Sequence, residues 1–195
     1  MVRRFLAVLL ALTLVGATAS VAQVSIGVGG QYLSLGGSDF EATDAGFGVE
    51  GNAMFSLGPS IKLGPSVQWS SHKDSFLDEN IKVLGIVGEG RYMIGMGAGK
   101  AKPYVGARAG WVQASADISG VGSAKQSGFA VGGGVGVLIA MTPTLAIDLN
   151  GMFHSVSFGD AKLDGTTIPE SQTSGTALQV RAGVNFKLGG GNGGM

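Results

Sequence analysis

Three acidic and three basic residues lie near the middles of segments in which polar and apolar residues alternate. Because side chains at every second position of a strand share a face, these charged groups can gather on one polar surface. Opposite charges in an interior of low dielectric offset part of their desolvation cost when they pair and form hydrogen bonds. We therefore predict a buried, mutually compensated ionic network. Its members are Glu50, Glu89, Arg91, Arg108, Asp148 and Arg181.

Other patterns that could carry chemistry are weaker. Residues 46–51 match the G-x-G-x-x-G string, but a dinucleotide site needs a strand before it and a helix after it, and this string lies inside an alternating segment. His154 is followed by Ser155 and Ser157, whose opposite parity points them to the other face, so a nucleophile–base pair is not expected. His72 is expected in a loop without an evident partner. The sequence therefore predicts no catalytic residue, no cofactor and no metal site.

The composition bounds the class of protein. The chain has 195 residues, enough for one domain, with 36 Gly, no Cys and 13 Lys+Arg against 13 Asp+Glu. The absence of Cys excludes a disulfide scaffold, a thiolate zinc site and a cysteine nucleophile. Balanced charge argues against a nucleic-acid partner, which usually requires a basic stripe. The glycines follow no Gly-x-y period and 45% of residues are hydrophobic, so the chain is neither collagen-like nor disordered.

The first 22 residues have the pattern of a secretory signal peptide. Arg3 and Arg4 give a positive start, residues 5–15 are apolar except for one Thr, and small residues precede the expected cleavage after Ala22. A membrane-anchoring helix is the alternative, but such a helix needs about 20 apolar residues. We therefore expect residues 1–22 to direct export of the chain.

From residue 23 onward the chain alternates apolar and polar residues in eight segments of about 11–13 residues. The clearest segments are 45–57, 61–70 and 178–188. The short, turn-rich connections are 57–60, 95–101 and 142–144, and the longer, polar ones are 36–44, 71–79, 116–125 and 158–174. This order places all long loops at one end, as in an up-and-down barrel. We predict a barrel over residues 23–188 and a Gly-rich tail over 189–195.

Two features indicate which face of the predicted barrel points outward. The polar face is poor in charge and rich in Gly, Ala and Ser, as expected for the cramped interior of an eight-stranded barrel. Large aromatic residues on the apolar face lie towards the strand ends, as in the girdles at the two membrane–water interfaces. The girdle residues are Tyr32, Phe47, Trp69, Trp111, Phe129 and Phe153 at the long-loop end, and Phe55, Tyr92 and Phe186 at the short-turn end. The predicted fold class is all-β, an eight-stranded antiparallel up-and-down transmembrane β-barrel. A soluble lipocalin-like carrier, with the apolar face inward, is the alternative.

Two stretches are typical of strands in small outer-membrane barrels: 103–107 (Pro-Tyr-Val-Gly-Ala) and 178–186 (Leu-Gln-Val-Arg-Ala-Gly-Val-Asn-Phe). Over the whole mature chain the pattern resembles the OmpA/OmpX-type family of eight-stranded barrels. The resemblance implies an integral protein of a Gram-negative-type outer membrane, with short turns in the periplasm and long loops outside. We further expect a monomer, with outer-membrane lipid, lipopolysaccharide and the outer-membrane assembly machinery as partners. The Gly-rich stretch after Phe186 is a departure, because family members usually end with an aromatic residue.

We therefore expect a non-catalytic integral outer-membrane protein with a structural role in the envelope or a role in surface interaction. The ionic network would plug the barrel, and a narrow porin-like channel is the alternative. The long loops are acidic, which is typical of a solvated surface, and divalent-cation bridging to lipopolysaccharide phosphates is the other interpretation. A lipid A-modifying enzyme is a further alternative. Outer-membrane lipid A deacylases use a His-x-Ser pair on one face, but His154 and its neighbouring serines do not share a face.

Overall fold

The computed structural model describes residues 23–41, 43–75, 79–95, 99–118 and 122–188. The predicted signal peptide (1–22) and the predicted Gly-rich tail (189–195) lie outside these residues. Across the described ranges, helices that are long and apolar enough to cross a membrane are absent.

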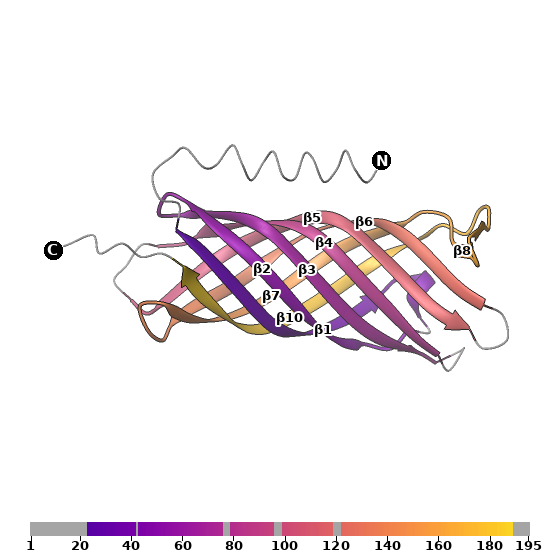
Figure 1. The fold of residues 1–195 in the computed structure, drawn as a ribbon, viewed down its shortest axis with the longest axis horizontal. Coiled ribbons are helices and arrows are strands. Elements are labelled where there is room, and N and C mark those ends of the chain that lie inside the picture. Colours follow the sequence, from indigo (N-terminus) through magenta and orange to yellow (C-terminus); the bar gives the residue numbers. More distant parts are fainter. Residues whose placement is uncertain (1–22, 42, 76–78, 96–98, 119–121, 189–195) are drawn as a thin grey trace.

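Eight long strands form one closed antiparallel barrel (Figure 1). They are β1 (Val24–Gly36), β2 (Gly46–Leu57), β3 (Ile61–Asp74), β4 (Glu79–Met93), β5 (Ala101–Ile118), β6 (Gly122–Ala140), β7 (Leu145–Phe158) and β10 (Thr173–Leu188). Each long strand pairs with its neighbours in the chain, and β1 pairs with β10 to close the barrel. The predicted fold class and up-and-down order are therefore confirmed.

The strands extend further towards the loop end than the alternation predicted. They run from 12 residues in β2 to 19 in β6. The predicted loop 116–125 is largely strand, because β5 and β6 continue to pair through Ala116 with Ala124 and Asp117 with Ser123. Backbone hydrogen bonding does not require alternating hydrophobicity, so a polar stretch can prolong the ladder beyond the apolar band.

Three short elements at the loop end were not predicted. They are the 3-10 helix η2 (Ser38–Phe40) and the strands β8 (Lys162–Leu163) and β9 (Thr166–Thr167). Asp164 and Gly165 connect β8 to β9 with positive φ angles of 48° and 87°. An Asp-Gly pair with both φ angles positive is the signature of a type I′ hairpin turn. The Asp-Gly pair was therefore the sequence signal for a hairpin within the predicted loop 158–174.

The apolar face of the barrel points outward, as predicted. Val28, Val131 and Val180 are 56%, 52% and 52% exposed, whereas Glu50 and Gln179 on the other face are 1% and 0% exposed. This arrangement excludes a lipocalin-like carrier, which needs its apolar face inside the barrel.

Glycines on the inner face allow neighbouring strands and side chains to approach closely. At Gly134 in β6, a Cβ atom would lie 2.7 Å from Cα of Met152 in β7 and closer still to the carbonyl oxygen of Gly151. At Gly106 in β5, a Cβ atom would lie 2.7 Å from Cε of the same Met152. The small residues thus make room for a fully buried methionine in a narrow lumen.

The lumen is layered along the barrel axis. Met93, Tyr104 and Leu138 form an apolar cluster towards the short-turn end. A second apolar cluster, formed by Val112, Ala130, Val156, Phe158 and Ala177, lies at the loop end. The charged side chains described below lie between the two clusters. The inner face therefore has an apolar cluster on each side of its charged middle, which the sequence reasoning did not anticipate.

Tryptophan fluorescence tests which face contacts lipid. Trp69 is 44% exposed on the outer face, so acyl chains carrying bromine should quench most of its fluorescence in vesicles. The control is a Trp69→Phe, Trp111→Phe, Phe158→Trp variant, whose single indole would lie in the lumen because Phe158 is buried there. Equal quenching in the two proteins would contradict the assignment of the faces.

Candidate functional site

Six charged side chains meet in the middle of the lumen and form a closed circuit of ion pairs, which we call the charged ring. Its members are Glu50 from β2, Glu89 and Arg91 from β4, Arg108 from β5, Asp148 from β7 and Arg181 from β10. Each carboxylate pairs with two arginines, and each arginine pairs with two carboxylates. These are the six residues that strand parity placed on one polar face.

Arg108 donates to two carboxylates of the charged ring. Its Nη1 and Nη2 atoms lie 2.8 and 2.9 Å from the two carboxylate oxygens of Glu50. Nη2 also lies 2.8 Å from Oε2 of Glu89. Gln179 supports this side, because its amide nitrogen donates to Glu50 over 3.0 Å and its amide oxygen accepts from Arg108 over 3.1 Å. Such two-pronged, charge-assisted bonds fix orientation as well as adding attraction.

Asp148 anchors the opposite side of the charged ring. Arg91 lies 2.8 Å from Asp148 and 2.5 Å from Glu89, and Arg181 pairs with both Asp148 and Glu50. The neutral neighbours satisfy remaining acceptors, since the Tyr104 hydroxyl donates to Asp148 over 2.8 Å and the Asn185 amide donates over 3.1 Å. The Arg91 guanidinium also stacks over the Tyr104 ring, 4.8 Å from its centroid.

The charged ring is buried and spans the lumen. Every member is at most 2% exposed. Two of its six ion pairs join strands three places apart around the barrel, β2 with β5 and β4 with β7, so these two span the interior. Three negative and three positive groups leave no net charge to favour either a cation or an anion in passage.

Not every buried polar atom near the charged ring has a hydrogen-bond partner. Within the described part of the chain, the unpartnered atoms include both amide atoms of Asn52, Nη2 of Arg91 and Nε of Arg108. Unpartnered buried polar groups are uncommon and each needs an explanation.

The predicted girdle residues lie on the outer face, each in the half of its strand that the sequence indicated. At the loop end, Tyr32 and Phe47 face each other across β1 and β2 with ring centroids 5.4 Å apart, and Trp111 pairs with Phe129 across β5 and β6. Most girdle side chains are exposed, while Phe55 and Trp111 are half-buried. The remaining members are Trp69 and Phe153 at the loop end and Tyr92 and Phe186 at the short-turn end.

His154 occupies the inner face, and its neighbouring serines do not. Its Nε2 atom lies 3.1 Å from the amide oxygen of Gln179, and the ring is buried. Ser155 and Ser157 are exposed on the outer face. No hydrogen-bonded nucleophile–base pair therefore forms at this position.

The expectation for His72 was wrong. The residue lies in β3, because the strand continues to Asp74, and it is only 1% exposed. Its Nε2 atom lies 3.0 Å from Oγ of Ser70 and its Nδ1 atom lies 3.2 Å from the Asp44 carbonyl oxygen. Ser70 is 2% exposed, so both members of this hydrogen-bonded pair are buried. These contacts give the buried side chains of Ser70 and His72 hydrogen-bond partners.

Two acidic side chains at the loop end bind the backbone of neighbouring segments. Asp39 accepts a hydrogen bond from the backbone NH of Ser174 over 2.8 Å, and Asp164 accepts one from Ser123 over 2.9 Å. Across the described residues, His, Cys, Asp and Glu side chains do not gather in threes that could hold a metal ion.

Comparison with known proteins identifies the same architecture elsewhere. A family profile described as outer membrane protein beta-barrel domain matches residues 5–186. The structure is similar to Neisserial surface protein A, with 18% identity, a TM-score of 0.65 and coverage of 85% of this chain and 97% of that chain. It is also similar to Ail, the attachment invasion locus protein of Yersinia pestis, with 15% identity, a TM-score of 0.57 and coverage of 86% and 99%. A third similar structure is OprG from Pseudomonas aeruginosa, with 13% identity, a TM-score of 0.53 and coverage of 87% of this chain and 97% of that chain. No curated protein matches the chain in sequence.

Proposed function

Because the chain belongs to the outer membrane protein beta-barrel domain family, we propose that it is a non-catalytic protein of the outer membrane whose barrel is held shut by the charged ring. Its role is structural in the envelope or lies in surface interaction through the loop end. The observation that supports this proposal is the closed circuit of ion pairs across the lumen. A pathway for solutes would need these pairs to separate, and each separation would leave a charge buried without its partner.

Single-channel recording in planar bilayers tests whether the lumen is shut. The wild-type barrel should give no conductance steps. A variant with Arg91→Ala and Asp148→Ala keeps the charges balanced but removes the connection between β4 and β7, so it should conduct. The matched control removes the exposed pair Lys82–Asp117, whose charged atoms lie 3.7 Å apart at the loop end, and should stay silent.

A narrow channel is the second candidate function. The observation in its favour is the set of unpartnered polar atoms on Asn52, Arg91 and Arg108, which water in the lumen could solvate. Wild-type conductance steps as large as those of the Arg91→Ala, Asp148→Ala variant would favour this channel and contradict the closed barrel.

The proposal includes partners of stated chemistry. The exposed apolar band contacts outer-membrane lipid, and the loop end faces lipopolysaccharide. Because several loop carboxylates already accept backbone hydrogen bonds, divalent-cation bridging would use the remaining acidic groups rather than a preformed site. The barrel is inserted by the outer-membrane assembly machinery and acts as a monomer.

A further inference from the structure

We propose that the loop-end half of the lumen is a binding site for a small uncharged amphiphile, a molecule with an apolar body and one oxygen that accepts a hydrogen bond. This site is separate from the closure of the barrel, since it lies on the loop side of the charged ring. We call it the outer chamber.

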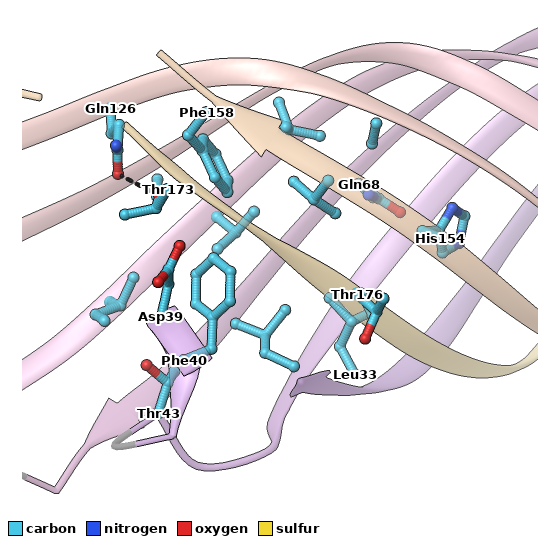
Figure 2. A pocket seen from close by; sticks show the side chains of 18 of the residues that line it. Leu33, Asp39, Phe40, Thr43, Gln68, Gln126, His154, Phe158, Thr173 and Thr176 are labelled. Atoms are coloured by element: carbon cyan, nitrogen blue, oxygen red, sulfur yellow. Dashed lines mark hydrogen bonds between the residues drawn. The ribbon is translucent and has the colours of Figure 1, made fainter. Parts of the chain in front are cut away.

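The outer chamber is a cavity of about 220 Å³ (Figure 2). Its walls come from seven of the eight long strands and are mainly apolar. They include Leu33, Val83, Val87, Val112, Val156 and Phe158. The apolar walls offer water few hydrogen-bond partners, so this part of the cavity favours an apolar occupant.

One end of the outer chamber is polar. Gln68, Arg108 and His154 border the cavity there, and Figure 2 shows Gln68 and His154 together, away from η2. The terminal nitrogens of Arg108 are taken by carboxylates of the charged ring, but its buried Nε has no hydrogen-bond partner in the described part of the chain. This N–H is covered by protein atoms, so a ligand oxygen accepts from it only after the neighbouring side chains at the polar end shift.

The other end of the outer chamber is covered by η2. Phe40 packs edge-on against Phe158, with ring centroids 6.2 Å apart, and its backbone NH is bonded to Gly37. The side chain of Asp39 holds this segment to the backbone NH of Ser174 in β10. Figure 2 shows Asp39, Phe40 and Thr43 on this side, so a ligand would enter from the loop end, past a cover attached at few points.

Volume and charge define the occupant. An engineered cavity of about 150 Å³ holds benzene, so a volume near 220 Å³ suits on the order of nine non-hydrogen atoms. Arg108 is the cation that borders the polar end, and it is already paired with Glu50 and Glu89. A charged ligand would therefore lack a free counter-ion there, whereas an uncharged alcohol or ketone oxygen can accept from Nε without one.

The test uses the full barrel in lipid nanodiscs with methyl-labelled valines and 1-octanol as the probe. The outer chamber holds Val87, Val112 and Val156, and the outer face holds Val131 and Val180. The chamber methyl signals should shift and saturate with octanol, while the outward ones should shift linearly as octanol partitions into lipid. n-Nonane, which has the same number of heavy atoms but no oxygen, should bind about tenfold more weakly.

Two variants separate binding from partitioning. Ala130→Leu fills part of the outer chamber, because Ala130 lines it, and should abolish the saturable shifts. Ala182→Leu adds the same bulk to the outer face and should leave them unchanged, with heat-modifiable gel migration confirming that both variants fold. Linear shifts at both sets of valines, or saturable shifts that survive Ala130→Leu, would overturn the site. Equal affinity for octanol and nonane would overturn the role of the polar end.

Discussion

Replacing Arg108 by methionine should lower the free energy of unfolding by about 3–5 kcal/mol, the usual cost of removing one partner from a buried ion pair. Arg108 bonds to both Glu50 and Glu89, and all three side chains are buried. Methionine keeps much of the volume but leaves two carboxylates each with one arginine instead of two. Urea-induced unfolding in lipid vesicles, followed by tryptophan fluorescence, measures the loss.

An exposed ion pair provides the matched control for Arg108→Met. Lys82 and Asp117 lie 3.7 Å apart with side chains 52% and 79% exposed, so Lys82→Met should cost less than about 1 kcal/mol. Glu50→Gln should lower the free energy of unfolding less in the Arg108→Met protein than in the wild type. The two losses are not additive because the two side chains are in contact. A loss for Arg108→Met no greater than that for Lys82→Met would show that the charged ring does not hold the barrel together.

Replacing Gly134 by valine should prevent the barrel from closing. The new Cβ atom would lie 2.7 Å from Cα of Met152 and nearer still to a backbone oxygen of the same strand. Overpacking typically costs about 1–3 kcal/mol when side chains can move aside. Here the nearest atoms belong to the backbone, so β6 and β7 would have to separate and the cost should be larger. Loss of the heat-modifiable folded band on gels is the measurement.

Gly151 in β7 is the control for Gly134. Gly151 lies on the outer face of β7, where it pairs with Val135 of β6. A Cβ atom added there would have no neighbour nearer than 4.0 Å. Gly151→Val should therefore fold as the wild type does. If both variants fold equally well, the close approach of β6 to β7 is not a constraint on the sequence.

The charged ring and the outer chamber depend on each other for geometry. Arg108 belongs to the ring and also borders the chamber. His154 borders the chamber and bonds to Gln179, which in turn bonds to Glu50. The ring thus supplies a polar base for an otherwise apolar cavity.

Several features of the site had a signal in the sequence that strand alternation alone did not capture. Val83, Val87, Val112 and Val156 have the parity of the inner face but are apolar. They indicate an apolar layer at the loop end. His72 shares its parity with Ser70, so extending the third segment by a few residues would have placed both on the inner face.

The sequence by itself determined the number of long strands, their order, the ends that carry long connections and the face on which the six charges lie. Each of these properties depends on a two-residue period or on turn residues, which are local. The tertiary structure alone decided which charges pair. Glu89 lies directly opposite Arg108 on the next strand, but Glu50 reaches Arg108 across the lumen, from a strand three places away. Such contacts depend on the tilt and register of the closed barrel, which bring side chains from distant strands to one height. For the same reason the outer chamber appears only when β1, β3, β4, β5, β6, β7 and β10 enclose it together.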